Sequence, residues 1–98
     1  MKKFATDSPV MFAFQLEGVE GTFSIPKMES LPVTLSARFA DIFRMDDDDE
    51  KTNAAYRLEV DILAKYLPPE AMDAIDARTM GAIFEAYMEQ DGDANPGE

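Results

Sequence analysis

VMFAFQLEGVEGTFSIP, residues 10–26, is the stretch of sequence that decides how this chain begins to fold. Apolar residues alternate with others over residues 10–16, which is the period-2 pattern of a half-buried strand. The following EGVEG contains two glycines suited to a turn, and TFSI at 22–25 would be the returning strand. Pro26 ends that strand, because it has no N–H to donate to a ladder. The pattern predicts a β-hairpin over residues 10–25.

The remainder of the chain predicts three or four helices, because apolar residues recur there at helical spacing. The first helix is expected to begin around Ser30, which would cap it, and to run to about Arg44. Pro32 would lie in its first turn, where a missing N–H costs nothing. The others are expected over about residues 51–66, 69–75 and 77–90, with Asp76 capping the last one. Between the first two, DDDDE at 46–50 is expected to be a solvated loop, since adjacent carboxylates repel one another, and its last members are expected to suit the N-terminus of the next helix.

These elements predict one small domain that is mainly α, with an N-terminal β-hairpin followed by three or four packed helices. Residues 1–9 are expected to be a flexible lead-in, and residues 10–90 the folded domain. Residues 91–98, DGDANPGE, are expected to be a disordered acidic tail.

Charge restricts the class of partner that the chain can bind. The 98 residues contain 20 acidic and nine basic side chains, for a formal charge of −11. A charge of that sign repels phosphate backbones and anionic lipid heads, so we expect neither nucleic-acid nor membrane binding. No segment has the apolar run of a signal peptide or a membrane span, which predicts a location in the cytoplasm where the chain was made.

The side chains that enzymes most often use are missing. The sequence has no His and no Cys, which removes the commonest general base and the most reactive nucleophile. Asp73 and Asp76 are better explained as capping or surface groups than as a catalytic pair. The run at 46–50 lacks the spacing of a helix-loop-helix calcium site. We therefore predict no enzymatic activity, no cofactor and no metal site.

Apolar side chains are numerous for so short a chain, with seven Phe, three Tyr and seven Met. We expect the apolar stripe of each helix, first of all, to pack into the core. A small domain has difficulty burying all of this surface, however, and Met-rich surfaces adapt to varied partners. We expect part of it to be left for a partner or for a second copy of the chain.

Several short motifs, in a fixed order, are typical of one protein family. The hairpin sequence is followed by KMESLP at 27–32, by YLPPE at 66–70 and by FEAYM at 84–88, before the acidic tail. This order resembles that of the small tail assembly chaperones of long, non-contractile-tailed bacteriophages, especially phages and prophages of actinobacteria. The resemblance covers roughly residues 10–98.

The resemblance implies a function. Such chaperones bind the aggregation-prone, helical tape measure protein before the tail tube forms around it, act in the cytoplasm of the bacterial host, and are absent from the mature virion. The family often also makes a longer product by ribosomal frameshifting, with an added domain that recruits tail tube protein. This sequence would correspond to the short form.

Helix-in-groove docking is the expected mode of binding, through the exposed parts of two apolar stripes. The predicted partner-binding residues on the first helix and its approach are Leu31, Leu35, Phe39 and Phe43, and those on the last helix are Phe84, Tyr87 and Met88. The alternative is a different functional class: an acidic phage or prophage protein that binds and inhibits a host nucleic-acid-binding protein. Basic residues that interrupt the acidic ones weaken this alternative.

Overall fold

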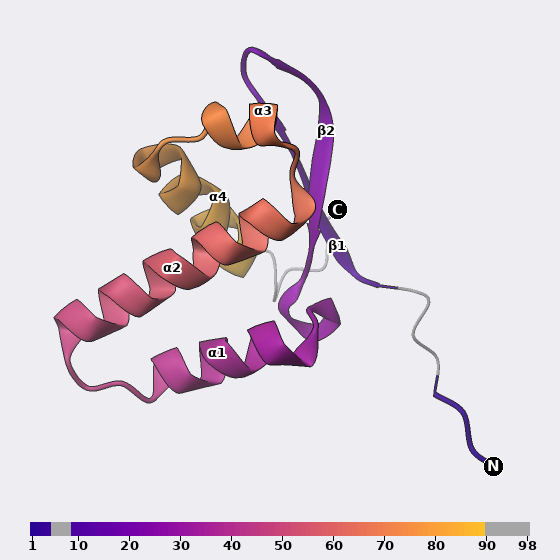
Figure 1. Ribbon diagram of the computed structural model, residues 1–98, viewed down its shortest axis with the longest axis vertical. Coiled ribbons are helices and arrows are strands. Elements are labelled where there is room, and N and C mark those ends of the chain that lie inside the picture. Colours follow the sequence, from indigo (N-terminus) through magenta and orange to yellow (C-terminus); the bar gives the residue numbers. More distant parts are fainter. Residues whose placement is uncertain (5–8, 90–98) are drawn as a thin grey trace.

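The computed structural model describes residues 1–4 and 9–89, which form a two-stranded hairpin followed by helices (Figure 1). The strands are β1 (Met11–Leu16) and β2 (Val19–Pro26), and a 3-10 turn, η1 (Met28–Ser30), follows them. The helices are α1 (Val33–Phe43), α2 (Asp48–Tyr66), α3 (Pro69–Asp73) and α4 (Ala77–Glu89). This confirms the predicted order of hairpin and helices. The expectations for residues 5–8 and 91–98 lie outside the described residues.

The hairpin is antiparallel, with Phe12 opposite Ile25 and Leu16 opposite Val19. Its turn is tighter than the sequence predicts, and β2 begins at Val19 instead of Thr22. The reason is that Glu17 and Gly18 alone form the turn, and Gly18 adopts the φ of 84° that such a tight connection needs. The register then shifts between Phe14 and Leu16, and Gly21, with a φ of 104°, takes up the irregularity inside β2.

Ser30 does not cap α1, contrary to the prediction. It lies in η1, and its Oγ accepts a hydrogen bond of 2.7 Å from the backbone N–H of Val10. The helix starts at Val33 after Pro32, which has no side chain able to cap. Ser30 therefore ties the start of the hairpin to the approach to α1.

The loop predicted over residues 46–50 is shorter than expected, because α2 begins at Asp48 and the last three carboxylates of the run form its first turn. The Asp47 carboxylate accepts a hydrogen bond of 3.3 Å from the backbone N–H of Glu50 and caps the helix. Carboxylates in a first turn also interact favourably with the helix dipole, which offsets their mutual repulsion. The cap predicted for α4 is confirmed, since Asp76 Oδ1 accepts from the Thr79 N–H at 2.8 Å. This hydrogen bond lowers the pKa of Asp76.

The core lies where the hairpin and the helices meet. In Figure 1, α1 and α2 run side by side, and the C-terminal end of α2 lies against β2. Every long element contributes at least one buried apolar side chain, as the periodic patterns predict. The buried set is Phe12, Leu16, Ile25, Leu31, Phe39, Ile42, Leu58, Ile62, Leu63, Leu67, Ala71, Met80, Ile83, Phe84 and Tyr87.

One charged residue, Lys27, is buried with this core, and the sequence does not reveal it. Only 5% of its surface is exposed, and its Nζ donates a hydrogen bond to the backbone carbonyl of Tyr87 in the last turn of α4. The same Nζ lies 4.6 Å from the centre of the Tyr87 ring. The Tyr87 hydroxyl in turn donates to the carbonyl of Pro26 at 2.7 Å. The last residue of β2, Pro26, and the residue that follows it, Lys27, are thus both bonded to the end of α4.

Replacing Tyr87 by Phe should lower the free energy of unfolding, because the buried Pro26 carbonyl loses its donor. We expect a loss of about 1–3 kcal/mol, measured by urea denaturation. Tyr56→Phe is the matched control, since Tyr56 is 49% exposed, and its effect should stay within about 0.5 kcal/mol. Equal effects of the two substitutions would contradict a structural role for the Tyr87 hydroxyl.

Candidate functional site

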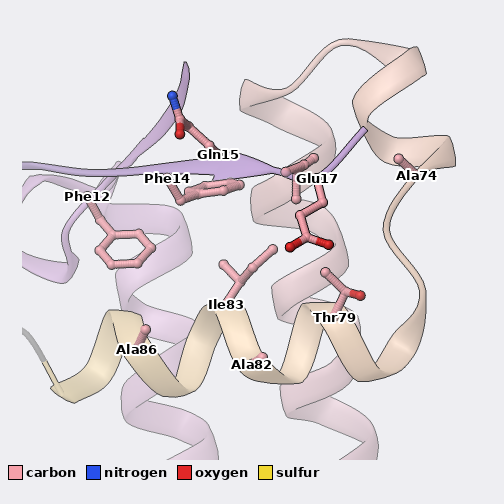
Figure 2. A pocket seen from close by; sticks show the side chains of 10 residues that line it. Phe12, Phe14, Gln15, Glu17, Ala74, Thr79, Ala82, Ile83 and Ala86 are labelled. Carbon is pink, nitrogen blue, oxygen red and sulfur yellow. The ribbon is translucent and has the colours of Figure 1, made fainter. Parts of the chain in front are cut away.

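Two hollows border α4, on opposite faces of the helix. The larger, with a volume of about 560 Å³, lies between β1 and α4. Figure 2 shows the rings of Phe12 and Phe14 on the strand side and Ile83 pointing toward the strand from α4. The small side chains of Ala82 and Ala86 leave room beside it. We call this hollow the hairpin groove.

The smaller hollow, of about 280 Å³, lies among α1, α2 and α4, and we call it the three-helix cleft. Each helix contributes residues at helical spacing, so that one face of each is turned to the same space. The cleft is lined by Phe39, Ile42 and Phe43 from α1, by Ala55 and Glu59 from α2, and by Gly81, Phe84, Glu85 and Met88 from α4.

The floor of the three-helix cleft is buried and its rims are exposed. Phe39 and Phe84 are 8% and 3% exposed, and both belong to the core. Phe43 and Met88, in contrast, are 57% and 39% exposed. The hairpin groove has buried core residues too, Phe12 and Ile83, but none of the large exposed apolar side chains among the described residues lines it. An exposed apolar rim is the surface that a partner protein would cover, which makes the three-helix cleft the stronger candidate.

The structure brings the two predicted stripes together, although only in part. Four of the seven predicted partner-binding residues line the three-helix cleft, namely Phe39, Phe43, Phe84 and Met88. Leu31 and Tyr87 are buried in the core, 7% and 1% exposed, and Leu35 is partly buried against it. Those three line neither the cleft nor the hairpin groove. Partner binding by any of the seven stays a prediction, with Phe43 and Met88 the most accessible.

Gly81 lines the cleft, and sequence reasoning missed it. It sits within α4, where Gly costs about 0.5–1 kcal/mol relative to Ala. A Cβ atom placed on Gly81 would meet nothing within 4 Å, so close packing does not require the glycine. Its missing side chain instead leaves this part of the cleft open.

Glu59 is the second lining residue that sequence reasoning missed. It is half-buried on α2, and this burial raises the pKa of its carboxyl above the ordinary value. Within residues 1–4 and 9–89, no hydrogen bond or ion pair is found for this side chain. The only signal in the sequence is its position four residues after Ala55, on the edge of the apolar stripe.

The described part of the chain contains no group of three or more Asp or Glu side chains arranged to hold a metal ion. Among the same residues, no helix combines the length and apolar character that crossing a membrane requires.

Comparison with known proteins gives no relative from which to assign the site. No protein-family model matches the sequence, and neither does any curated protein or solved structure. The candidate site therefore rests on the geometry of the cleft and on its exposed apolar rims.

Substituting Glu59 by Gln should raise the free energy of unfolding at neutral pH, because a neutral amide is penalised less by burial than a carboxylate. The folded-state pKa lies above the ordinary 4.5, so the folded protein binds this proton more tightly than the unfolded chain does. Wild-type stability should therefore fall as pH rises from 4.5 through the folded-state pKa. The advantage of the variant should be largest above that pKa and should shrink as the pH falls from it to 4.5.

Urea denaturation across this pH range measures the effect. Glu20→Gln is the control, since Glu20 is exposed on β2 and lines neither hollow. A gain in stability that is equal for the two substitutions, or that grows toward acid pH, would contradict the burial of Glu59.

Proposed function

We propose that this protein is a bacteriophage tail assembly chaperone that binds the tape measure protein and keeps it from aggregating until the tail tube forms. Binding would take place at the three-helix cleft, which would receive one apolar face of an amphipathic helix. The observation that carries the proposal is the placement of Phe43 and Met88. Both are large, exposed and apolar, and both stand at a cleft with a buried apolar floor.

The composition of the cleft suits a partner with a repeated helical sequence. A docked helix would present apolar side chains at i, i+3 or i+4, and i+7, and these would enter the space between α1 and α4. Met88 can adapt its unbranched side chain to different anchors, and Phe43 adds a large apolar contact. A cleft of this kind can hold successive segments of a helical protein without reading one fixed sequence.

Net charge supports the same role. A formal charge of −11 would keep a complex with an aggregation-prone partner dispersed. The alternative class, an inhibitor of a host nucleic-acid-binding protein, calls for carboxylates spread along one face. Here the acidic run forms the start of a helix, and Arg38 and Arg44 pair with Asp61 and Asp41. These observations do not favour the alternative.

Filling the cleft should remove the activity while leaving the fold intact. Gly81→Leu places a side chain where a Cβ atom meets nothing within 4 Å, and it exchanges Gly for a better helix former. Co-expressed with the tape measure protein of the same phage or prophage, the variant should leave that protein insoluble, whereas wild type should keep it in solution.

The matched control is Ala64→Leu, which adds the same side chain at an exposed position of α2 that lines neither hollow. This control should retain the wild-type effect on tape measure solubility. Urea denaturation should find Gly81→Leu at least as stable as wild type. A stable Gly81→Leu variant that still keeps the tape measure protein in solution would exclude the cleft as the binding site.

A further inference from the structure

Glu59 occupies an unusual electrostatic position. It lies 11 residues after the start of α2, well beyond the first turn in which a helix dipole stabilises a carboxylate. The residues three and four positions away along the helix are Tyr56, Ala55, Ile62 and Leu63, so α2 places no cation at the spacings where helical side chains pair. A half-buried carboxylate without a partner reduces the stability of the free protein.

The rest of the cleft does not compensate for this charge. Among the described residues that line the cleft, the other charged one is Glu85, on α4, and there is no Lys or Arg. The residues three and four positions from Glu85 are Gly81, Ala82, Met88 and Glu89, which also include no cation. The cleft is therefore an apolar hollow with two carboxylates and no positive charge in its lining.

We infer that Glu59 selects the partner, by pairing with a Lys or Arg that the docked helix carries within one turn of its apolar anchor. This inference rests on the proposed function of the cleft and adds the chemistry of the segment that it binds. The segment is an amphipathic helix whose apolar stripe is bordered by a cationic side chain.

Docking strengthens such a pair. A helix seated on Phe43 and Met88 would exclude water from Glu59, and a charge pair in a drier environment attracts more strongly. An acidic helix would instead meet repulsion from both Glu59 and Glu85, which adds discrimination against the wrong partner. A second copy of this chain is disfavoured as the occupant, because it would bring another net charge of −11.

Two designed amphipathic peptides of about 15 residues test the inference. Both carry a Leu stripe at i, i+3, i+4 and i+7, and they differ only in one residue beside the stripe, Lys in one and Gln in the other. Wild type should bind the Lys peptide about tenfold more tightly than the Gln peptide, at the low end of couplings measured for close interfacial charge pairs. Glu59→Gln should lose most of this preference, keeping only the part that comes from the exposed Glu85.

The control variant is Glu20→Gln, which removes the same charge from an exposed site on β2 and should keep the preference for Lys. Fluorescence anisotropy measures all six affinities, and Gly81→Leu reports whether binding occurs in the cleft. An equal loss of preference in Glu20→Gln would show that net charge alone attracts the peptide, and would overturn the role of Glu59.

Different results would contradict the docking function of the cleft and the role of Glu59. If wild type binds both peptides equally and Gly81→Leu binds neither, the cleft is a docking site and the inference about Glu59 is wrong. If wild type binds neither peptide, or if Gly81→Leu binds them as well as wild type does, the proposed function of the cleft fails too. Dimerisation of wild type that Gly81→Leu abolishes would assign the cleft to a second copy and overturn both.

Discussion

The fold depends on one buried contact that joins the end of the hairpin to the end of α4. Lys27 donates to the carbonyl of Tyr87, and the Tyr87 hydroxyl donates to the carbonyl of Pro26. Removing an ammonium group from water is costly, and here a hydrogen bond and the faces of two aromatic rings, Tyr87 and Phe12, offset part of that cost. Because the contact fixes the C-terminal turn of α4, it also fixes which face of α4 is turned to the hairpin and which to α1 and α2.

Much of the architecture follows from periodic patterns in the sequence, since burial in each long element is a local property. The alternation in β1 predicts that Phe12 and Leu16 face the core, and the i, i+3, i+4 stripe predicts the same for Met80 and Ile83. Boundaries are predicted less well where two local effects compete. Repulsion among carboxylates argues for a loop before residue 51, yet capping by Asp47 and the helix dipole extend α2 back to Asp48.

The candidate site is harder to predict, because it is made of contacts between distant parts of the chain. The sequence indicates apolar stripes on the first and last helices, but it does not show that Phe43 and Met88 border the same cleft. It also gives no reason to separate Leu31 and Tyr87, which are buried, from those two exposed residues. Gly81 and Glu59 are unfavourable where they stand, and both line the cleft. Residues that weaken the local structure in this way are expected where binding matters more than stability.

The burial of Lys27 also gives the protein an internal reporter of its own opening. Lys2, Lys3 and Lys65 are exposed and Lys51 is partly so, whereas Lys27 is 5% exposed. An amine-directed acylating reagent would therefore modify the other lysines in the native state and reach Lys27 only after α4 has separated from the hairpin. The rate at which this amine reacts therefore measures how often α4 detaches from the hairpin. The measurement needs no engineered label and no global unfolding.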